Sequence, residues 1–206
     1  MTPAGPGKVV LHVGARVPVT HAEGPGARFA LWLQGCSIRC LACCNPHLFE
    51  AEGGVPLSAA ALLAEVAAVR SQIEGVTLLG GEPFEQAPAL ARFASGVRAL
   101  GLSVLAFSGY RLEELRARPD AGVAALLAAT DVLVDGRYEA ALPETQRLWA
   151  GSTNQRFHYL TNRYTSAIER PAPGDPLRSV EIRLSPDGSL SLNGWPAFPR
   201  ASERTR

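Results

Sequence analysis

The chain has 206 residues, of which 47% are hydrophobic and 19% are charged, and its formal net charge at pH 7 is +1. This size and composition predict a globular domain that buries a core, and they exclude an intrinsically disordered chain. The small net charge gives no reason to expect nucleic acid or an acidic membrane surface as a partner.

The start of the chain bears on where the protein works. The segment Thr2-Pro3-Ala4-Gly5-Pro6 has no basic stretch followed by an apolar one, so no secretory signal is predicted. We therefore expect a cytoplasmic protein. In that reducing compartment, cysteines are more often metal ligands or catalysts than disulfide partners.

Predicted strands and helices alternate through the first two thirds of the chain, after a tail at residues 1–7 that is expected to be flexible. Short apolar runs, the first two rich in β-branched and aromatic residues, predict strands at residues 8–13, 29–33, 76–79, 102–107 and 132–134. Helices are predicted at residues 58–71, 87–100, 111–118 and 121–129. The first of these has Ser58 as its N-cap and apolar residues at helical spacing.

Repetition of strand, loop and helix is typical of a parallel sheet with right-handed crossovers. The units are too few for a closed barrel of eight, so we expect an α/β fold, an open partial (β/α) barrel, in a single domain at residues 1–206. The C-terminal part, residues 171–206, differs and begins with a proline-rich connector. A β-hairpin is predicted there, with strands at residues 179–184 and 189–192 and a tight turn between them.

All four cysteines of the chain lie between residues 36 and 44. Cys36, Cys40 and Cys43 have the spacing C-x3-C-x2-C, which lets one short loop wrap one face of an iron–sulfur cluster. Three thiolates leave one iron of a [4Fe–4S] cluster without a protein ligand, and an open metal position is what a chelating cofactor needs. Cys44 is interpreted as a non-ligand, because the side chains of adjacent residues tend to diverge.

Two other interpretations of the cysteines stay open on spacing alone. A zinc site usually has two C-x2-C pairs that are well separated in sequence, whereas here one short loop holds every cysteine. Buried cysteines without a ligand are the second alternative, and they need no such spacing. The spacing therefore favours an iron–sulfur cluster over zinc without deciding between them.

Further segments occur in an order that matches one known family. They are Gly24-Pro25-Gly26-Ala27-Arg28, Gly35-Cys36 through Cys43 with Asn45, Gly80-Gly81-Glu82-Pro83, Ser108-Gly109-Tyr110, Leu133-Val134-Asp135-Gly136 and Gly151-Ser152-Thr153-Asn154-Gln155. Together with the cysteine motif they resemble the radical S-adenosylmethionine superfamily, and within it the anaerobic ribonucleoside-triphosphate reductase-activating family. The resemblance covers roughly residues 14–160, and the C-terminal tail is less distinctive.

The resemblance implies a fold and a reaction. A single [4Fe–4S] cluster, held by Cys36, Cys40 and Cys43, would bind the amino and carboxylate groups of S-adenosylmethionine at its open iron. Reduction would then cleave the cofactor to methionine and a 5′-deoxyadenosyl radical. That radical would abstract a Cα hydrogen from a glycine of a partner enzyme such as anaerobic ribonucleotide reductase. Reduced flavodoxin or ferredoxin is the implied electron donor.

The same comparison indicates residues for the cofactor site. Gly80 and Gly81 follow a predicted strand at its carboxyl end, where α/β sheets place ligands and where glycines let the backbone approach closely. The carboxylate of Glu82 would accept a hydrogen bond from the cofactor's ammonium group, and Pro83 would make the turn rigid. Ser108, at the end of the next strand, is expected either to face the same cavity or to cap a helix.

Contacts with the adenine are expected from backbone atoms in the cysteine loop. Many members of the superfamily carry an aromatic residue just before the third cysteine, and this chain has Ala42. The closer family often has an aromatic residue or histidine just after it, and this chain has Cys44. These departures weaken the case for aromatic stacking on the adenine but leave the ligands untouched. The candidates are therefore backbone atoms of Ala42, Cys43 and Cys44.

Other polar residues receive no firm role from the sequence. Tyr110 and Asp135 lie at strand ends and are interpreted as facing either the cavity or their own secondary structure. No function is assigned to His21, His47 or His158, because single histidines are usually structural or exposed. No catalytic residue beyond the cluster ligands is predicted.

Two alternative functions stay open. The first is a radical S-adenosylmethionine enzyme of the same build that modifies a peptide or a small molecule. The second, of another class, is a non-catalytic module that binds zinc or an iron–sulfur cluster. It would account for the cysteines but not for the glycine-rich turn or the later strand-end motifs.

Overall fold

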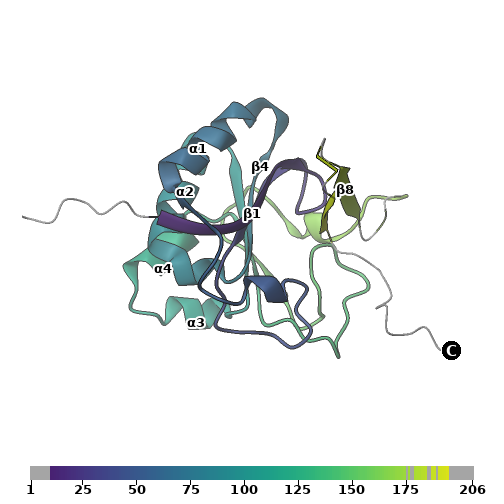
Figure 1. Ribbon diagram of the computed structural model, residues 1–206. Coiled ribbons are helices and arrows are strands. Elements are labelled where there is room, and N and C mark those ends of the chain that lie inside the picture. Colours follow the sequence, from purple (N-terminus) through teal and green to yellow (C-terminus); the bar gives the residue numbers. More distant parts are fainter. Residues whose placement is uncertain (1–9, 175, 177–178, 185–186, 189, 195–206) are drawn as a thin grey trace, which may run out of the picture.

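A seven-stranded sheet crosses the centre of the protein (Figure 1), with the strand order β3-β1-β2-β4-β5-β6-β7. The computed structural model describes residues 10–174, 176, 179–184, 187–188 and 190–194. The predicted tail at residues 1–7 and part of the predicted hairpin turn lie outside the described residues. The strands are β1 (Val10–Thr20), β2 (Arg28–Leu33), β3 (Val55–Ser58), β4 (Gly75–Gly80), β5 (Ser103–Ser108), β6 (Val132–Asp135) and β7 (Arg156–Tyr159).

Four neighbouring strands, β2, β4, β5 and β6, run parallel to one another. Their carboxyl ends therefore meet at one edge of the sheet, which is where ligands bind in α/β proteins. The strands β1, β3 and β7 are antiparallel to their neighbours, and β3 and β7 form the two sides of the sheet. The fold is mixed α/β, as predicted.

The helices lie together on one face of the sheet (Figure 1). They are α1 (Ala59–Ala68), α2 (Ala87–Ala99), α3 (Leu112–Arg116) and α4 (Ala121–Ala128). Ser58 caps α1 as predicted, because its hydroxyl accepts a hydrogen bond of 3.1 Å from the backbone N–H of Ala61. Between sheet and helices lies the main core, to which α2 contributes the fully buried Leu90 and the almost fully buried Phe93.

The C-terminal segment forms the predicted hairpin. Strands β8 (Val180–Leu184) and β9 (Leu190–Gly194) pair antiparallel as a separate two-stranded sheet. Among the described residues, four short 3-10 helices also interrupt the loops, η1 (Pro46–Leu48), η2 (Arg70–Gln72), η3 (Pro83–Gln86) and η4 (Ser166–Glu169). Within the described part of the chain, no helix has the length and apolar character that crossing a membrane requires.

The sequence missed the strands at the sides of the sheet. The second half of β1 and the whole of β3 and β7 were not predicted. In β1 and β3 most of the unpredicted residues are exposed or half-buried, and β7 has only four residues, none of them fully buried. Such strands lack the continuous apolar run by which the buried parallel strands were recognised.

Candidate active site

A cavity of about 1000 Å³ lies at the edge where the parallel strands end. Gly80 and Gly81 line it at the end of β4, Ser108 and Gly109 line it at the end of β5, and Gly136 follows β6. The cysteine loop forms another part of the wall. The structure therefore brings together residues that the sequence predicted from three separate segments.

All four cysteines are free thiols and line this cavity. Cys36, Cys40 and Cys43 are half-buried, and Cys44 is exposed. A hydrogen bond between the side chains of Cys43 and Cys44 lowers the pKa of the Cys43 thiol to about 6 and raises that of Cys44. Burial is the main cause that raises the pKa of the Cys36 and Cys40 thiols.

Backbone hydrogen bonds close the cysteine loop at its base. The N–H of Gly35 donates to the carbonyl of Leu48 at 2.9 Å, and the N–H of Cys36 donates to the carbonyl of Phe49 at 3.0 Å. Between these ends, Arg39 and Ala42 have φ angles of 50° and 61°, in the left-handed region that non-glycine residues rarely adopt. Strained backbone of this kind concentrates at binding sites, and here it belongs to the turns between successive cysteines.

The glycine pair after β4 is packed against the base of the cysteine loop. The N–H of Gly81 donates to the carbonyl of Leu33 at 2.7 Å. A Cβ atom at Gly81 would lie 2.1 Å from the carbonyl oxygen of Gly35, and Gly80 has a φ of 106°. Glycine is therefore required at Gly81 because the turn after β4 approaches the loop, and at Gly80 because φ is positive and β2 lies close. Both reasons go beyond the predicted approach to a ligand.

Glu82 is almost completely buried and joins two strand ends. Its carboxylate accepts hydrogen bonds from the Ser108 hydroxyl at 2.9 Å, the Gly109 N–H at 2.9 Å and the Phe84 N–H at 3.0 Å. Burial raises the pKa of this carboxyl to about 7, although the three donors act in the opposite direction. Both carboxylate oxygens thus hold β5 against the turn, and the expected contact with an ammonium group stays a prediction.

Other predicted residues divide between the cavity wall and the surrounding structure. Ser108 lines the cavity, contacts Glu82 and accepts a hydrogen bond of 3.1 Å from the Tyr110 N–H in the turn after β5. It does not cap a helix, because the N-cap of α3 is Arg111. Pro83 is buried at the start of η3, and Ala42 lies in the turn between Cys40 and Cys43; neither residue lines the cavity. The Tyr110 hydroxyl donates to Glu85 at 3.0 Å.

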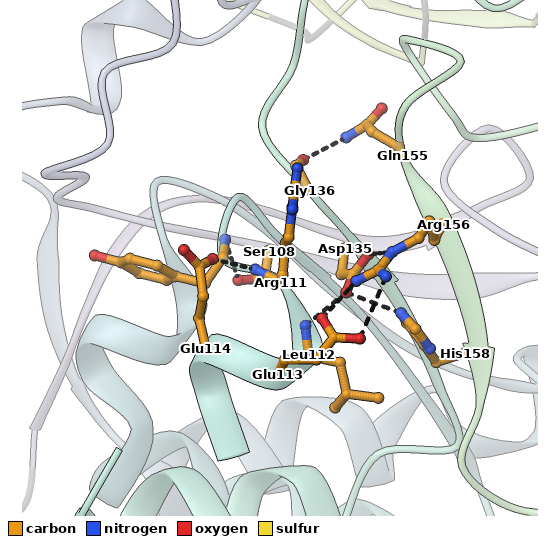
Figure 2. Close-up of polar contacts among 11 residues, drawn as sticks. Ser108, Arg111, Leu112, Glu113, Glu114, Asp135, Gly136, Gln155, Arg156 and His158 are labelled. Atoms are coloured by element: carbon orange, nitrogen blue, oxygen red, sulfur yellow. Dashed lines mark hydrogen bonds and ion pairs between the residues drawn. The ribbon is translucent and has the colours of Figure 1, made fainter. Parts of the chain in front are cut away.

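Asp135 is a structural anchor at the end of β6 (Figure 2). It is fully buried and accepts hydrogen bonds from the Leu112 N–H at 2.6 Å and from Arg156 at 3.0 and 2.8 Å. Nε2 of His158 lies 2.8 Å from Oδ2 of Asp135 but is not aligned for a hydrogen bond. Asp135 therefore holds β7 and the start of α3, and its neighbour Gly136 faces the cavity.

Sequence reasoning left the segment Gly151–Gln155 without a role. In the structure Gly151 and Gln155 line the cavity, and the Gln155 side-chain amide donates to the carbonyl of Gly136 at 3.1 Å (Figure 2). The same side chain accepts a hydrogen bond of 2.8 Å from the Gly151 N–H. This segment therefore forms the wall beyond β6. Its motif was noticed in the sequence, but not its position.

Arg28 was recognised only as part of a motif. It is fully buried, and its guanidinium donates to the Thr77 hydroxyl at 3.1 Å, the Ser103 hydroxyl at 2.6 Å and the Val76 carbonyl at 2.6 Å. Burial is the main cause that lowers its pKa. Arg28 thus ties together the starts of β2, β4 and β5, a role that no local sequence pattern could reveal.

The donor set can be tested against a metal group. In the part of the chain that the structure describes, no three His, Cys, Asp or Glu side chains are close enough to hold one metal ion. A zinc ion needs such convergence on one point, whereas the thiolates of a [4Fe–4S] cluster bind separate irons. Three half-buried free thiols on the wall of one cavity fit a cluster of this kind.

Comparisons with known proteins place these features in context. A family model described as "4Fe-4S single cluster domain" matches residues 22–158. The anaerobic ribonucleoside-triphosphate reductase-activating protein of Escherichia coli K12 is 29% identical over 150 residues, which cover 69% of this chain and 95% of that protein. The protein of the same name from Enterobacteria phage T4 is 32% identical over 145 residues, covering 68% and 88%.

Among solved structures, QueE from Escherichia coli is similar, with a TM-score of 0.43 and 18% sequence identity. The similar region covers 50% of this chain and 54% of that chain.

Proposed function

The chain belongs to the 4Fe-4S single-cluster family and, within it, to the family of anaerobic ribonucleoside-triphosphate reductase-activating proteins, and we propose that it activates a reductase of that class. The activation would install a glycyl radical by removing a Cα hydrogen from one glycine of the partner. The observation that carries this proposal is the common cavity, whose wall combines three thiols at C-x3-C-x2-C spacing with the glycine turn of β4.

In this proposal Cys36, Cys40 and Cys43 hold a [4Fe–4S] cluster and leave one iron open. When bound, the cluster supplies the electron that cleaves S-adenosylmethionine into methionine and a 5′-deoxyadenosyl radical. The chain's own part is to fix the geometry. Because the base of the loop is hydrogen-bonded to η1 and to the turn after β4, the thiols are held beside the strand ends.

The remaining site residues position the cofactor. Gly80 and Gly81 line the cavity, and their backbone carbonyls would accept hydrogen bonds from the ammonium group. Glu82 and Pro83 fix the turn that carries those carbonyls, and Ser108 is held by Glu82 at the neighbouring strand end. Adenine would contact the backbone of the loop, for which the candidates remain Ala42, Cys43 and Cys44.

Two further features support the proposal. We infer that the sheet is the open partial (β/α) barrel expected from the sequence, since four parallel strands lie side by side with the helices on one face. The cavity, at about 1000 Å³, is also at the upper end of the range for small-molecule sites. It therefore has room for a polypeptide segment beside the cofactor.

Anaerobic reconstitution followed by activity assays tests the proposal. We expect about four irons per chain, 5′-deoxyadenosine from the reduced protein with S-adenosylmethionine, and a glycyl radical signal in electron paramagnetic resonance when the reductase is added. Stoichiometric zinc without iron would refute the assignment. Cys36→Ala should abolish cluster binding, and Cys44→Ala, on the same loop, is the matched control that should retain it.

A further inference from the structure

The C-terminal hairpin presents an apolar face to solvent. Its register pairs Ile182 with Leu192 and Leu184 with Leu190, which places the four side chains on one face. They are 61%, 48%, 73% and 59% exposed, respectively. Contiguous exposed apolar side chains on a folded protein mark an interaction site, whereas single ones do not.

The other side of the hairpin is attached to the end of β1 and to the loop that follows it. The Asn193 side chain donates to the Thr20 hydroxyl at 2.9 Å, and the Gly194 N–H donates to Glu23 at 2.6 Å. The Arg183 guanidinium donates to the carbonyl of Val19 at 3.0 Å. A two-stranded hairpin is marginally stable alone, so these contacts fix its orientation and keep the apolar face outward.

The apolar face is continuous with the candidate active site. Val180 and Leu192, at the attached end of the hairpin, line the cavity. From there the face extends along the strands to Leu184 and Leu190, next to the turn. A protein whose segment enters the cavity would therefore press its adjoining surface against this face, whereas a small molecule inside the cavity would not reach its outer end.

We propose that this hairpin face docks the protein substrate, namely the reductase-class enzyme whose glycine-bearing segment enters the cavity. The proposal rests on the proposed function and names the surface that selects the partner. The matching partner surface is an apolar patch beside the glycine segment. The hairpin lies outside residues 22–158, which match the family model, so we assign this surface to the selection of the partner and not to the cleavage of the cofactor.

The test separates docking from cofactor cleavage. Leu184→Ser/Leu190→Ser changes the two residues of the outer end, and Leu184→Ser alone changes the most exposed one. Removing two leucines from a contact should raise the KM for the reductase about tenfold or more. Cleavage of S-adenosylmethionine by the dithionite-reduced protein alone should stay within about twofold of wild type. Val55→Ser, at a 52% exposed position of β3, is the matched control.

Each outcome has a definite meaning. Glycyl radical formation by the double variant with an unchanged KM overturns the docking proposal. The proposal is also overturned if the KM is unchanged and the oligomeric state changes in size-exclusion chromatography, because a second copy would then cover the face. It is overturned likewise if the KM is unchanged and the midpoint of thermal unfolding is lower, because residues 195–206 would then cover the face. If the double variant loses cofactor cleavage, the KM for the reductase is measured on Leu184→Ser instead, and that value decides whether the face docks the reductase. Failure of the wild type to cleave S-adenosylmethionine refutes the proposed function instead.

Discussion

The buried carboxyl of Glu82 makes the stability of the cluster-free protein depend on pH. Burial raises its pKa from 4.5 to about 7. A carboxyl with a raised pKa binds a proton more tightly in the folded state, so its contribution to stability is present below pH 4.5. That contribution is lost as the pH rises from 4.5 through 7.

The magnitude follows from the shift. A change of one pKa unit corresponds to about 1.4 kcal/mol, so ionisation of Glu82 should cost the folded state on the order of 3 kcal/mol between pH 4.5 and pH 8. No reduction for solvent screening applies, because the side chain is almost completely buried. Glu23, whose pKa burial also raises to about 7, would add to the total pH dependence, so the Glu82 share must be isolated.

The Glu82→Gln variant isolates that share. Urea denaturation of the cluster-free wild type and variant, measured anaerobically from pH 5 to pH 8, gives the free energy of unfolding of each. We expect the free energy of unfolding of the wild type, relative to that of the variant, to decrease by about 3 kcal/mol as the pH rises, because glutamine does not titrate. A difference that is independent of pH, or that favours the wild type at high pH, would show that the three hydrogen-bond donors keep the carboxylate ionised.

Three further substitutions test the framework around the cavity. Arg28→Ala should lower the free energy of unfolding by about 3–5 kcal/mol, because it removes a buried group with several charged hydrogen bonds; a loss under about 1 kcal/mol in urea denaturation contradicts this. Gly81→Ala should cost about 3 kcal/mol by pushing the turn away from Gly35, and an unchanged thermal midpoint argues against that contact. Asp135→Asn should cost about 2 kcal/mol and loosen β7, seen as faster hydrogen exchange at Phe157 and Tyr159; unchanged exchange refutes the anchoring role.

The sequence predicted the centre of the fold better than its sides. The strands β2, β4, β5 and β6 are buried on both faces, so in the sequence they are short apolar runs between glycines and helices. Exposed residues interrupt β1, and β3 has no buried residue, so pairing with a neighbour rather than composition makes these segments strands. Their existence depends on tertiary contact, which a local pattern does not record.

The candidate site, too, could be predicted from the sequence only in part. Cysteine spacing and the glycine pair were recognisable because the chemistry lies within a few consecutive residues. The partners of Arg28 and Glu82 were not, since Thr77 and Ser103 lie 49 and 75 residues from Arg28, and Ser108 lies 26 residues from Glu82. A single sequence shows that a charged residue is present, but burial and pairing come only with the fold.

The family resemblance drew attention to positions 42 and 44, and the way in which the loop is held shows what depends on their side chains. The cysteine loop is fixed at its base by the Gly35 and Cys36 amides and by the backbone of the turn at Gly81, and none of these contacts uses a side chain at positions 42 or 44. Ala42 has a left-handed φ of 61°, a conformation that costs energy for every residue with a Cβ atom and does not depend on an aromatic ring. A change of side chain at position 42 therefore leaves the base of the loop in place, whereas a change at Cys44 also removes its side-chain hydrogen bond to Cys43, one of the three thiols.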